Sequence, residues 1–327
     1  MVVDNDSLFH TKKGTAVELP QPLAPLADTH GHLTSFRRVR ASEALVRAAL
    51  AGVRLLVVPV DPVDDVEDVP AFLSWFGQTV EDARTMLADL AARGVEPPVF
   101  PGWENAPSLM DNVHFLAGVH PYGARSFMDD AHIRERMELL LDDSRCVGVG
   151  EIGLDYGPWN KLPADVQAEA FRAQLRIAHQ RSMPVELHLR DADNDEQVLA
   201  HKDALRILLE EGIPSEGCDL HCFTCGPEVM KPFVEHGCHI AFGGAVTFAR
   251  SEAIRDAAAS CPAELILSET DSPYMSPVPL RGQECEPGMV SLSVATIAEV
   301  RERAIGCAQQ AVYEDLWRNA NAFFGLV

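Results

Sequence analysis

The stretch Leu23-Ala-Pro-Leu-Ala-Asp-Thr-His-Gly-His32 is a short apolar run that ends in two histidines one residue apart. Such a run is typical of a buried strand, and residues two apart on an extended chain point to the same side. His30 and His32 are therefore expected to present both imidazoles to one site, with Asp28 as a candidate to orient one ring. Taken alone, such a pair also fits ordinary surface or core histidines.

The same pattern, an apolar run that ends in a metal-seeking side chain, recurs at Glu151, His188, His221 and Asp271. Longer segments of helical period separate the runs, which is the signature of βα units around a parallel sheet. Strands are expected at residues 23–28, 53–60, 113–118, 146–151, 184–189, 218–223, 239–243 and 265–269. Helices are expected at 42–51, 80–93, 130–141, 164–181, 197–211, 227–236, 251–260, 295–303 and 309–319.

Eight strands, each followed by a helix, predict an α/β fold of the (β/α)8 TIM-barrel type, with its active site at the C-terminal rim of the strands. An open doubly wound sheet holds the same alternation, but it would gather ligands near its switch point rather than from five of eight strands. We therefore expect a polar N-terminal extension at residues 1–22 and one barrel domain at 23–327. Insertions are expected around the second helix, at 61–77 on the catalytic face and at 96–112 on the opposite face.

Composition limits the function of this chain of 327 residues, which is 47% hydrophobic and has a net charge of −22. No apolar stretch approaches the roughly 18 residues of a membrane span, and the first residues lack the apolar run of a signal peptide. A cytoplasmic location with reduced cysteines is expected, without a membrane or an obligate protein partner. The negative charge opposes nucleic-acid binding through a basic surface, but metal ions can supply local positive charge.

The predicted metal site consists of six side chains: His30, His32, Glu151, His188, His221 and Asp271. Mixed imidazole and carboxylate ligands suit two divalent ions such as Mg, Mn or Zn. Glu151 is expected to bridge the ions, with ion pairing inside the barrel as the alternative. Two such ions activate water and stabilise a phosphoryl oxygen, so Glu151 and Asp271 are the predicted catalytic residues, and Asp271 is expected to take the proton of the water. Glu269 is expected to support the site from inside the barrel.

Three further residues are candidates for substrate contact. His120 ends the third strand and is placed to hydrogen-bond a substrate phosphate, with a structural role equally open. Arg190 and Arg281 fall on rim loops and are candidate phosphate clamps, with surface ion pairing as the alternative. Cys222 and Cys225 form a CxxC pair without the second pair of a zinc ribbon, so packed cysteines are expected. The remaining histidines, His201 among them, show no site-like placement.

The segment at residues 61–77 is acidic and then aromatic. Its aromatic residues Phe72, Trp75 and Phe76 leave three roles open: stacking on bases, packing on the barrel, or contact with a partner. The acidic part is expected to repel long polyanions from the mouth of the barrel. Deletion of 64–76 is therefore expected to alter substrate preference more than metal binding.

Six motifs, taken in order, resemble those of the TatD-type metal-dependent deoxyribonucleases of the amidohydrolase superfamily. They are Asp28-Thr-His-Gly-His-Leu33, Gly118-Val-His-Pro121, Gly150-Glu-Ile-Gly-Leu-Asp155, Glu186-Leu-His-Leu-Arg-Asp-Ala192, His221-Cys-Phe-Thr224 and Glu269-Thr-Asp-Ser-Pro-Tyr274. The resemblance implies a TIM barrel that hydrolyses DNA phosphodiesters with divalent metals, often as a 3′ exonuclease. It implies metals on the same six residues, and phosphate contact around His120 and the Arg281-Gly282 loop.

The chain departs from this family's pattern at three places. Cys285 stands where the family usually has asparagine, Cys225 stands where glycine is common, and the segment 61–77 is unexpected. None of these is a proposed metal ligand, so they bear on the choice of substrate. The leading hypothesis is a hydrolase of DNA 3′ ends or short oligonucleotides. The alternatives are a hydrolase of a small phosphoester, amide or lactone, and a non-catalytic scaffold, against which the complete ligand set argues.

Overall fold

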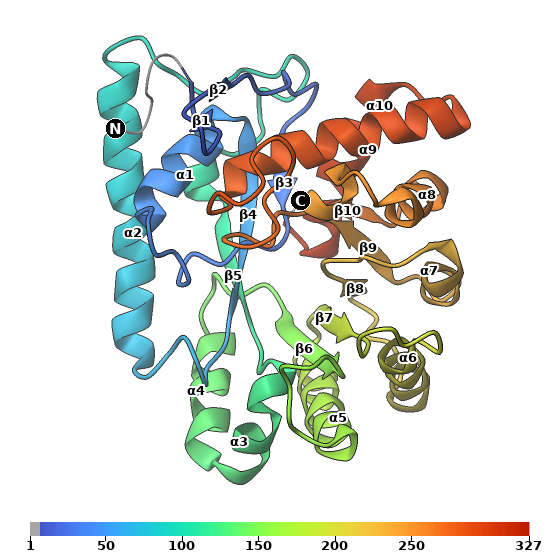
Figure 1. Cartoon of the computed structure of the whole chain (residues 1–327). Coiled ribbons are helices and arrows are strands. Elements are labelled where there is room, and N and C mark those ends of the chain that lie inside the picture. Colours follow the sequence, from blue (N-terminus) through green and yellow to red (C-terminus); the bar gives the residue numbers. More distant parts are fainter. Residues whose placement is uncertain (1–6, 327) are drawn as a thin grey trace.

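The computed structural model describes residues 7–326 and has eight strands, β3 to β10, with helices lying outside them (Figure 1). The strands are β3 (Leu26–Asp28), β4 (Val53–Val60), β5 (Val113–Ala117), β6 (Val149–Asp155), β7 (Val185–Arg190), β8 (Cys218–Leu220), β9 (His239–Phe242) and β10 (Ile266–Ser268). Each overlaps a predicted strand, although β6 begins and ends later than the predicted 146–151, and the predicted (β/α)8 barrel is confirmed.

Ten helices accompany the strands. They are α1 (Ala41–Leu50), α2 (Val69–Ala91), α3 (Ala124–Asp129), α4 (Ala131–Leu141), α5 (Ala164–Arg181), α6 (Leu199–Glu211), α7 (Pro227–Val234), α8 (Glu252–Ser260), α9 (Val290–Ile305) and α10 (Gln309–Phe323). Short 3-10 turns lie at Leu109–Asp111, Pro121–Gly123, Gly244–Thr247 and Pro287–Met289.

All neighbouring strands of the barrel run parallel, in the orders β3-β4-β5 and β6-β7-β8-β9-β10. Backbone hydrogen bonds connect the two groups at both seams. The Phe115 N–H donates to the Arg145 carbonyl at 3.0 Å, and the Thr29 N–H donates to the Ser268 carbonyl at 3.0 Å. The C-terminal ends of all eight strands therefore meet at one rim, where residues far apart in sequence share one space.

The interior of the barrel is apolar toward its N-terminal end. Inward-facing residues such as Leu55, Val57 and Leu267 form one buried cluster with Trp317 and Phe323 of α10. Phe323 also packs on His239, the first residue of β9, with ring centroids 4.9 Å apart. Helix α10 thus closes the N-terminal end of the barrel, and the C-terminal end is left for polar side chains.

Helix α2 begins at Val69, so the expected start at residue 80 and the interpretation of 61–77 as one insertion are wrong. Asp68 caps the helix by accepting a hydrogen bond from the Ala71 N–H at 2.7 Å. Phe72 and Phe76, four residues apart, lie on the buried face and pack against Phe115. Of the three open roles, these two rings therefore have the packing role, and deletion of 64–76 would remove part of the core.

The described part of the N-terminal extension forms a small hairpin of β1 (Phe9–His10) and β2 (Ala16–Val17). Phe9 and Val17 are buried in a cluster with Leu280 and Met289. Residues 1–6 of the predicted extension lie outside the described residues. Within residues 7–326, no helix combines the length and apolar character needed to cross a bilayer.

The close approach of β5 to β6 leads to a stability prediction for two glycines. A Cβ at Gly118 would lie 2.7–2.9 Å from backbone atoms of Gly150, whereas a Cβ at Gly77, inside α2, would make an ordinary 3.5 Å contact with Arg145. We expect Gly118→Ala to lower the free energy of unfolding by about 1–3 kcal/mol because of overpacking. Gly77→Ala should raise it by about 0.5–1 kcal/mol because the unfolded chain loses entropy. Urea denaturation measures both, and a Gly118→Ala protein as stable as the parent would contradict the packing.

Candidate metal centre

All six predicted ligands gather at the C-terminal rim of the barrel. They come from five strands or the turns directly after them: β3, β6, β7, β8 and β10. Five of the six line a cavity of about 410 Å³: His32, Glu151, His188, His221 and Asp271. His30 is fully buried beneath them. The structure therefore brings together every residue of the predicted set, and metal binding by these residues remains a prediction.

Glu151 lies between two groups of donor atoms. Its Oε1 is 3.9 Å from His32 Nε2, whereas its Oε2 is 3.0 Å from His221 Nε2 and 3.1 Å from His188 Nδ1. The two oxygens of one carboxylate thus face two different sets of imidazoles. This is the arrangement expected of a ligand shared by two ions.

The first group contains His30, His32 and Asp271. The Nε2 atoms of the two histidines are 3.1 Å apart, and they lie 3.8 and 3.7 Å from Asp271 Oδ1. Ligand atoms bound to one ion at about 2.0–2.2 Å lie roughly 3–3.5 Å from one another. The group is therefore slightly wider than a loaded site on the two edges to Asp271 and matches it between the two histidines.

The second group contains His188, His221 and the Oε2 atom of Glu151. His188 Nδ1 is 3.3 Å from His221 Nε2. His120 lies against this group, with its ring centroid 4.3 Å from that of His188. Two imidazoles and one carboxylate oxygen are a donor set that suits divalent transition metals and leaves positions open for water or substrate.

Two buried carboxylates fix the orientation of the imidazoles. Glu186 Oε1 is 2.8 Å from His30 Nδ1, and Asp155 Oδ2 is 3.2 Å from His188 Nε2. Each carboxylate accepts a hydrogen bond from one ring nitrogen, which leaves the other nitrogen facing the site. The expectation that Asp28 orients a ring is wrong, because its oxygens accept hydrogen bonds from the backbone and side chain of Thr270 at 2.8 and 2.7 Å.

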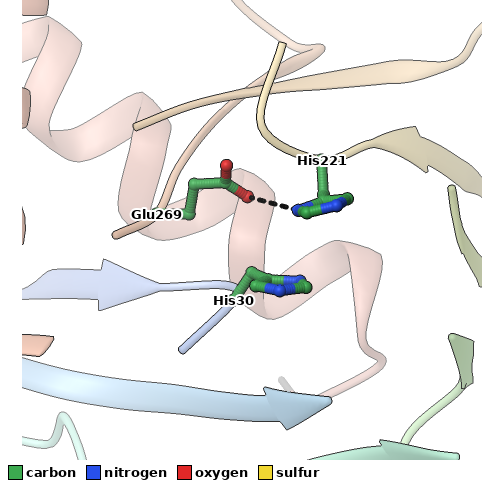
Figure 2. A group of neighbouring side chains, drawn as sticks. All are labelled: His30, His221 and Glu269. Carbon is green, nitrogen blue, oxygen red and sulfur yellow. Dashed lines mark ion pairs between the residues drawn. The ribbon is translucent and has the colours of Figure 1, made fainter. Parts of the chain in front are cut away.

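Glu269 supports the site from inside the barrel, as Figure 2 shows. Its Oε1 accepts a hydrogen bond from the Cys222 N–H at 2.5 Å, and its Oε2 is 3.9 Å from His221 Nδ1. The rings of His30 and His221 stack with centroids 4.0 Å apart. Among the described residues, His221 Nδ1 and Glu269 Oε2 have no hydrogen-bond partner. A small inward shift of His221 would therefore form a hydrogen bond between these two atoms.

Burial sets the charge of the site. It lowers the pKa of His30 and of His32 to about 4 and that of His221 to about 3, so these imidazoles are neutral, the form that binds metal. For His188 burial opposes protonation, but hydrogen bonds to Asp155 and Glu151 raise its pKa to about 9. Burial and the nearby Glu151 raise the pKa of Asp271 well above its usual value. Divalent cations would relieve this crowding of carboxylates, so the donor set fits them.

The three candidates for substrate contact differ in whether they line the cavity. His120 and Arg190 line the cavity. His120 also has a structural role, since its Nδ1 accepts a hydrogen bond from the Tyr122 N–H at 3.1 Å. Arg281 is not among the cavity-lining residues of the described chain, and its guanidinium lies over the ring of Phe248, 3.8 Å from the centroid.

Sequence reasoning missed several residues of the cavity wall. Tyr122 and Tyr274 line it and are 43% and 56% exposed, so each offers an open aromatic face. Tyr274 ends the motif that begins at Glu269, and Tyr122 directly follows the motif Gly118–Pro121, so proximity to these motifs was the available signal. Asp61, Asp64 and Asp65 line the same cavity, which confirms that the acidic part of 61–77 lies beside the mouth.

Comparisons with known proteins agree with this geometry. The family model described as "TatD related DNase" matches residues 27–325. The chain is 37% identical over 220 residues to the uncharacterized metal-dependent hydrolase YcfH of Escherichia coli K12, which covers 64% of this chain and 77% of that protein. It is 29% identical over 207 residues to the human 3'-5' RNA nuclease TATDN2, covering 62% and 26% of the two chains.

Among solved structures, the chain is similar to the TatD homologue YjjV of Escherichia coli K12, with a TM-score of 0.67 and 24% identity. That likeness covers 93% of this chain and 100% of the other. It shows a shared fold over almost the whole length.

The contact between Glu186 and His30 leads to a prediction about metal affinity. Glu186→Ala removes the acceptor that holds the His30 ring, so the affinity for divalent metal should fall about 10–100-fold. Glu169→Ala, at an exposed position of α5, is the matched control and should leave affinity unchanged. Metal titration by calorimetry measures both, after thermal denaturation has shown that each variant is folded. An unchanged affinity in Glu186→Ala would remove Glu186 from the site.

Proposed function

The chain belongs to the TatD-related DNase family of metal-dependent hydrolases, and on that premise we propose that it is a two-metal phosphodiesterase. Its proposed substrates are DNA 3′ ends or short oligonucleotides. The observation that carries the proposal is the position of Glu151, whose two carboxylate oxygens face two separate groups of imidazoles.

The proposed ligands divide into two sets around Glu151. His30, His32 and Asp271 would hold one ion, and His188 and His221 would hold the other. Two divalent ions there, such as Mg, Mn or Zn, would lower the pKa of a water molecule and offset the negative charge of the phosphoryl oxygens. Glu186 and Asp155 would keep the rings of His30 and His188 oriented for this task.

Asp271 is the proposed general base. Its Oδ1 faces His30 and His32 across the first group, and its Oδ2 is 3.7 Å from Cys222 Sγ, at the floor of the cavity. A carboxylate in this position can accept the proton of the attacking water while it remains beside the metal ligands. Glu151, shared between both sets, is the proposed second catalytic residue because it fixes their separation.

Basic side chains beside the metal cavity support a phosphate-bearing substrate. Arg190 lines the metal cavity itself. A neighbouring cavity of about 260 Å³ shares Ser35 and Tyr274 with it and is lined by the exposed Arg37 and Arg38. Within the described chain the side chains of these two arginines form no ion pair, and their backbone N–H groups donate to Glu284, which also lines this cavity. A single strand of nucleic acid would thus extend from the metal cavity across Tyr274, and one of its bases would stack on the ring of Tyr274.

The acidic residues of the same wall restrict the substrate. Asp61, Asp64 and Asp65 line the metal cavity, and the whole chain has a net charge of −22. Three carboxylates repel the phosphate groups of a substrate. Short oligonucleotides or chain ends, which bring few phosphates to this wall, therefore fit better than long polyanions. The same observation favours the second candidate, a hydrolase of small phosphodiesters. RNA is a further candidate substrate, because the human relative is named as an RNA nuclease.

The proposed location is the cytoplasm. All eight cysteines lie within the described residues, and none is joined in a disulfide. Free thiols support a reducing compartment.

The role of Asp271 leads to a prediction about turnover. Asp271→Asn should lower kcat on a single-stranded DNA oligonucleotide about 10²–10⁴-fold, because the amide cannot accept the proton. Asp89→Asn, an exposed position on α2, is the matched control and should retain activity. The assay uses Mg or Mn, with a chelator arm that should abolish cleavage in the parent protein. Wild-type turnover and wild-type metal content in Asp271→Asn would contradict the assignment.

The acidic wall leads to a prediction about substrate length. Asp64 is exposed and lines the cavity, so Asp64→Asn removes one negative charge at the mouth. The kcat/KM for an oligonucleotide of about twenty nucleotides should rise roughly 2–5-fold at low salt. The kcat/KM for a small phosphodiester should change little. Asp89→Asn again serves as the control. An equal change on both substrates, or none on either, would remove the acidic wall from the account of specificity.

A further inference from the structure

A second cluster of chemically active side chains lies outside the six-ligand set. Asp191 follows β7, His201 belongs to α6, and Cys225 lies in the loop between β8 and α7. His201 Nδ1 is 2.6 Å from Asp191 Oδ2, and His201 Nε2 is 4.0 Å from Cys225 Sγ. The three residues therefore form a thiol, imidazole and carboxylate in line, the order in which a base activates a nucleophile.

The imidazole of His201 is held in one orientation. Asp191 Oδ1 accepts a hydrogen bond from the Ala200 N–H at 2.7 Å, so both of its oxygens are engaged by the first turns of α6. The ring is only 6% exposed and packs edge-on against Phe223 and Phe233. With Nδ1 donating to Asp191, Nε2 is left facing the sulfur.

We propose that Cys225 is a reactive thiol, a site of covalent modification by hydroperoxides and soft electrophiles, with His201 as the base and Asp191 as its positioning residue. Cys225 is partly exposed, so a small reagent can reach it. Burial opposes protonation of His201, but the hydrogen bonds to Asp191 and Cys225 outweigh it and raise its pKa to about 9. At neutral pH the ring therefore holds the proton, and an imidazolium beside a sulfur favours the thiolate.

The reaction with a hydroperoxide balances without any further reagent. The sulfur attacks one peroxide oxygen, so that an S–O bond forms and the O–O bond breaks. The thiol proton passes to His201 Nε2 and then to the departing oxygen. Sulfur is oxidised by two electrons to the sulfenic acid, and the peroxide is reduced to water or an alcohol.

The surroundings distinguish Cys225 from the other cysteine of the CxxC pair. Cys222 Sγ is 3.7 Å from Asp271 Oδ2, and the backbone of Cys222 bonds to Glu269. Carboxylates beside a sulfur oppose the thiolate, whereas an imidazole favours it. The two thiols, three residues apart, thus face opposite environments, and reactivity should be confined to Cys225.

A metal site is the competing reading of this cluster, because its three donor types also bind cations. Both oxygens of Asp191 are already engaged, however, so only His201 Nε2 and Cys225 Sγ remain free to bind. A structural zinc site needs four ligands. The geometry therefore favours the thiol and its base.

The test is alkylation of the intact protein with substoichiometric iodoacetamide at pH 7, followed by mass spectrometry of the cysteine peptides. Cys307, which is also partly exposed, is the internal reference. Cys225 should react at least about tenfold faster than Cys307, and His201→Gln should remove that advantage while Cys307 keeps its rate. Asp191→Asn, which keeps the imidazole, should give an intermediate rate. After peroxide, a dimedone adduct should appear on Cys225 and be lost in Cys225→Ser.

Three results would overturn the proposal. The first is a rate for Cys225 no greater than that for Cys307 in the parent protein, and the second is an unchanged rate for Cys225 in His201→Gln. The third is labelling of Cys225 that appears only after a chelator is added, which would make the cluster a metal site. Rapid labelling of the buried Cys146 and Cys238 reports unfolding of a variant, and the rate in Asp191→Asn then decides the question.

Discussion

The structure depends on the compensation of negative charge inside the barrel. Five carboxylates lie on or directly after its strands: Glu151, Glu186, Asp219, Glu269 and Asp271. Burial raises the pKa of Glu186, Asp219 and Glu269, and neighbouring carboxylates raise it further. Both oxygens of Asp219 lack a hydrogen-bond partner among the described residues. Burying so many carboxylates together is costly without positive charge, and bound divalent cations would supply it at the point where the imidazoles converge.

The parallel barrel makes this concentration of charge possible. Apolar residues fill the N-terminal end, where α10 closes it, and the metal-seeking side chains come from within β6 and β7 and from the turns that follow β3, β8 and β10. The buried apolar core thus stabilises the fold. The buried carboxylates at the rim lower the stability of the fold. Along β7 the buried core residue Leu187 and the cavity-lining His188 are direct neighbours in sequence.

Much of this arrangement was predictable from local signals. Near-continuous apolar runs located the eight strands, and the polar residues at or near the ends of those runs located the six candidate ligands. Contacts between distant residues had no such signal: Glu186 meets His30 across 156 positions, Arg281 stacks on Phe248, and His201 meets Cys225. The start of helix α2 was predicted too far along the chain, although Asp68 is a capping residue. The reason is that the acidic residues around Asp68 are typical of a loop. Phe72 and Phe76 are explained by their four-residue spacing, which places both on the buried face of the helix.

The central claim is that Glu151 is shared by two divalent ions, and anomalous scattering from crystals soaked in Mn²⁺ tests it most directly. The account predicts two anomalous peaks, one on each side of the Glu151 carboxylate, the first against His30, His32 and Asp271 and the second against His188 and His221. A single peak with no contact to Glu151, or a rim that stays empty at saturating Mn²⁺, would contradict it.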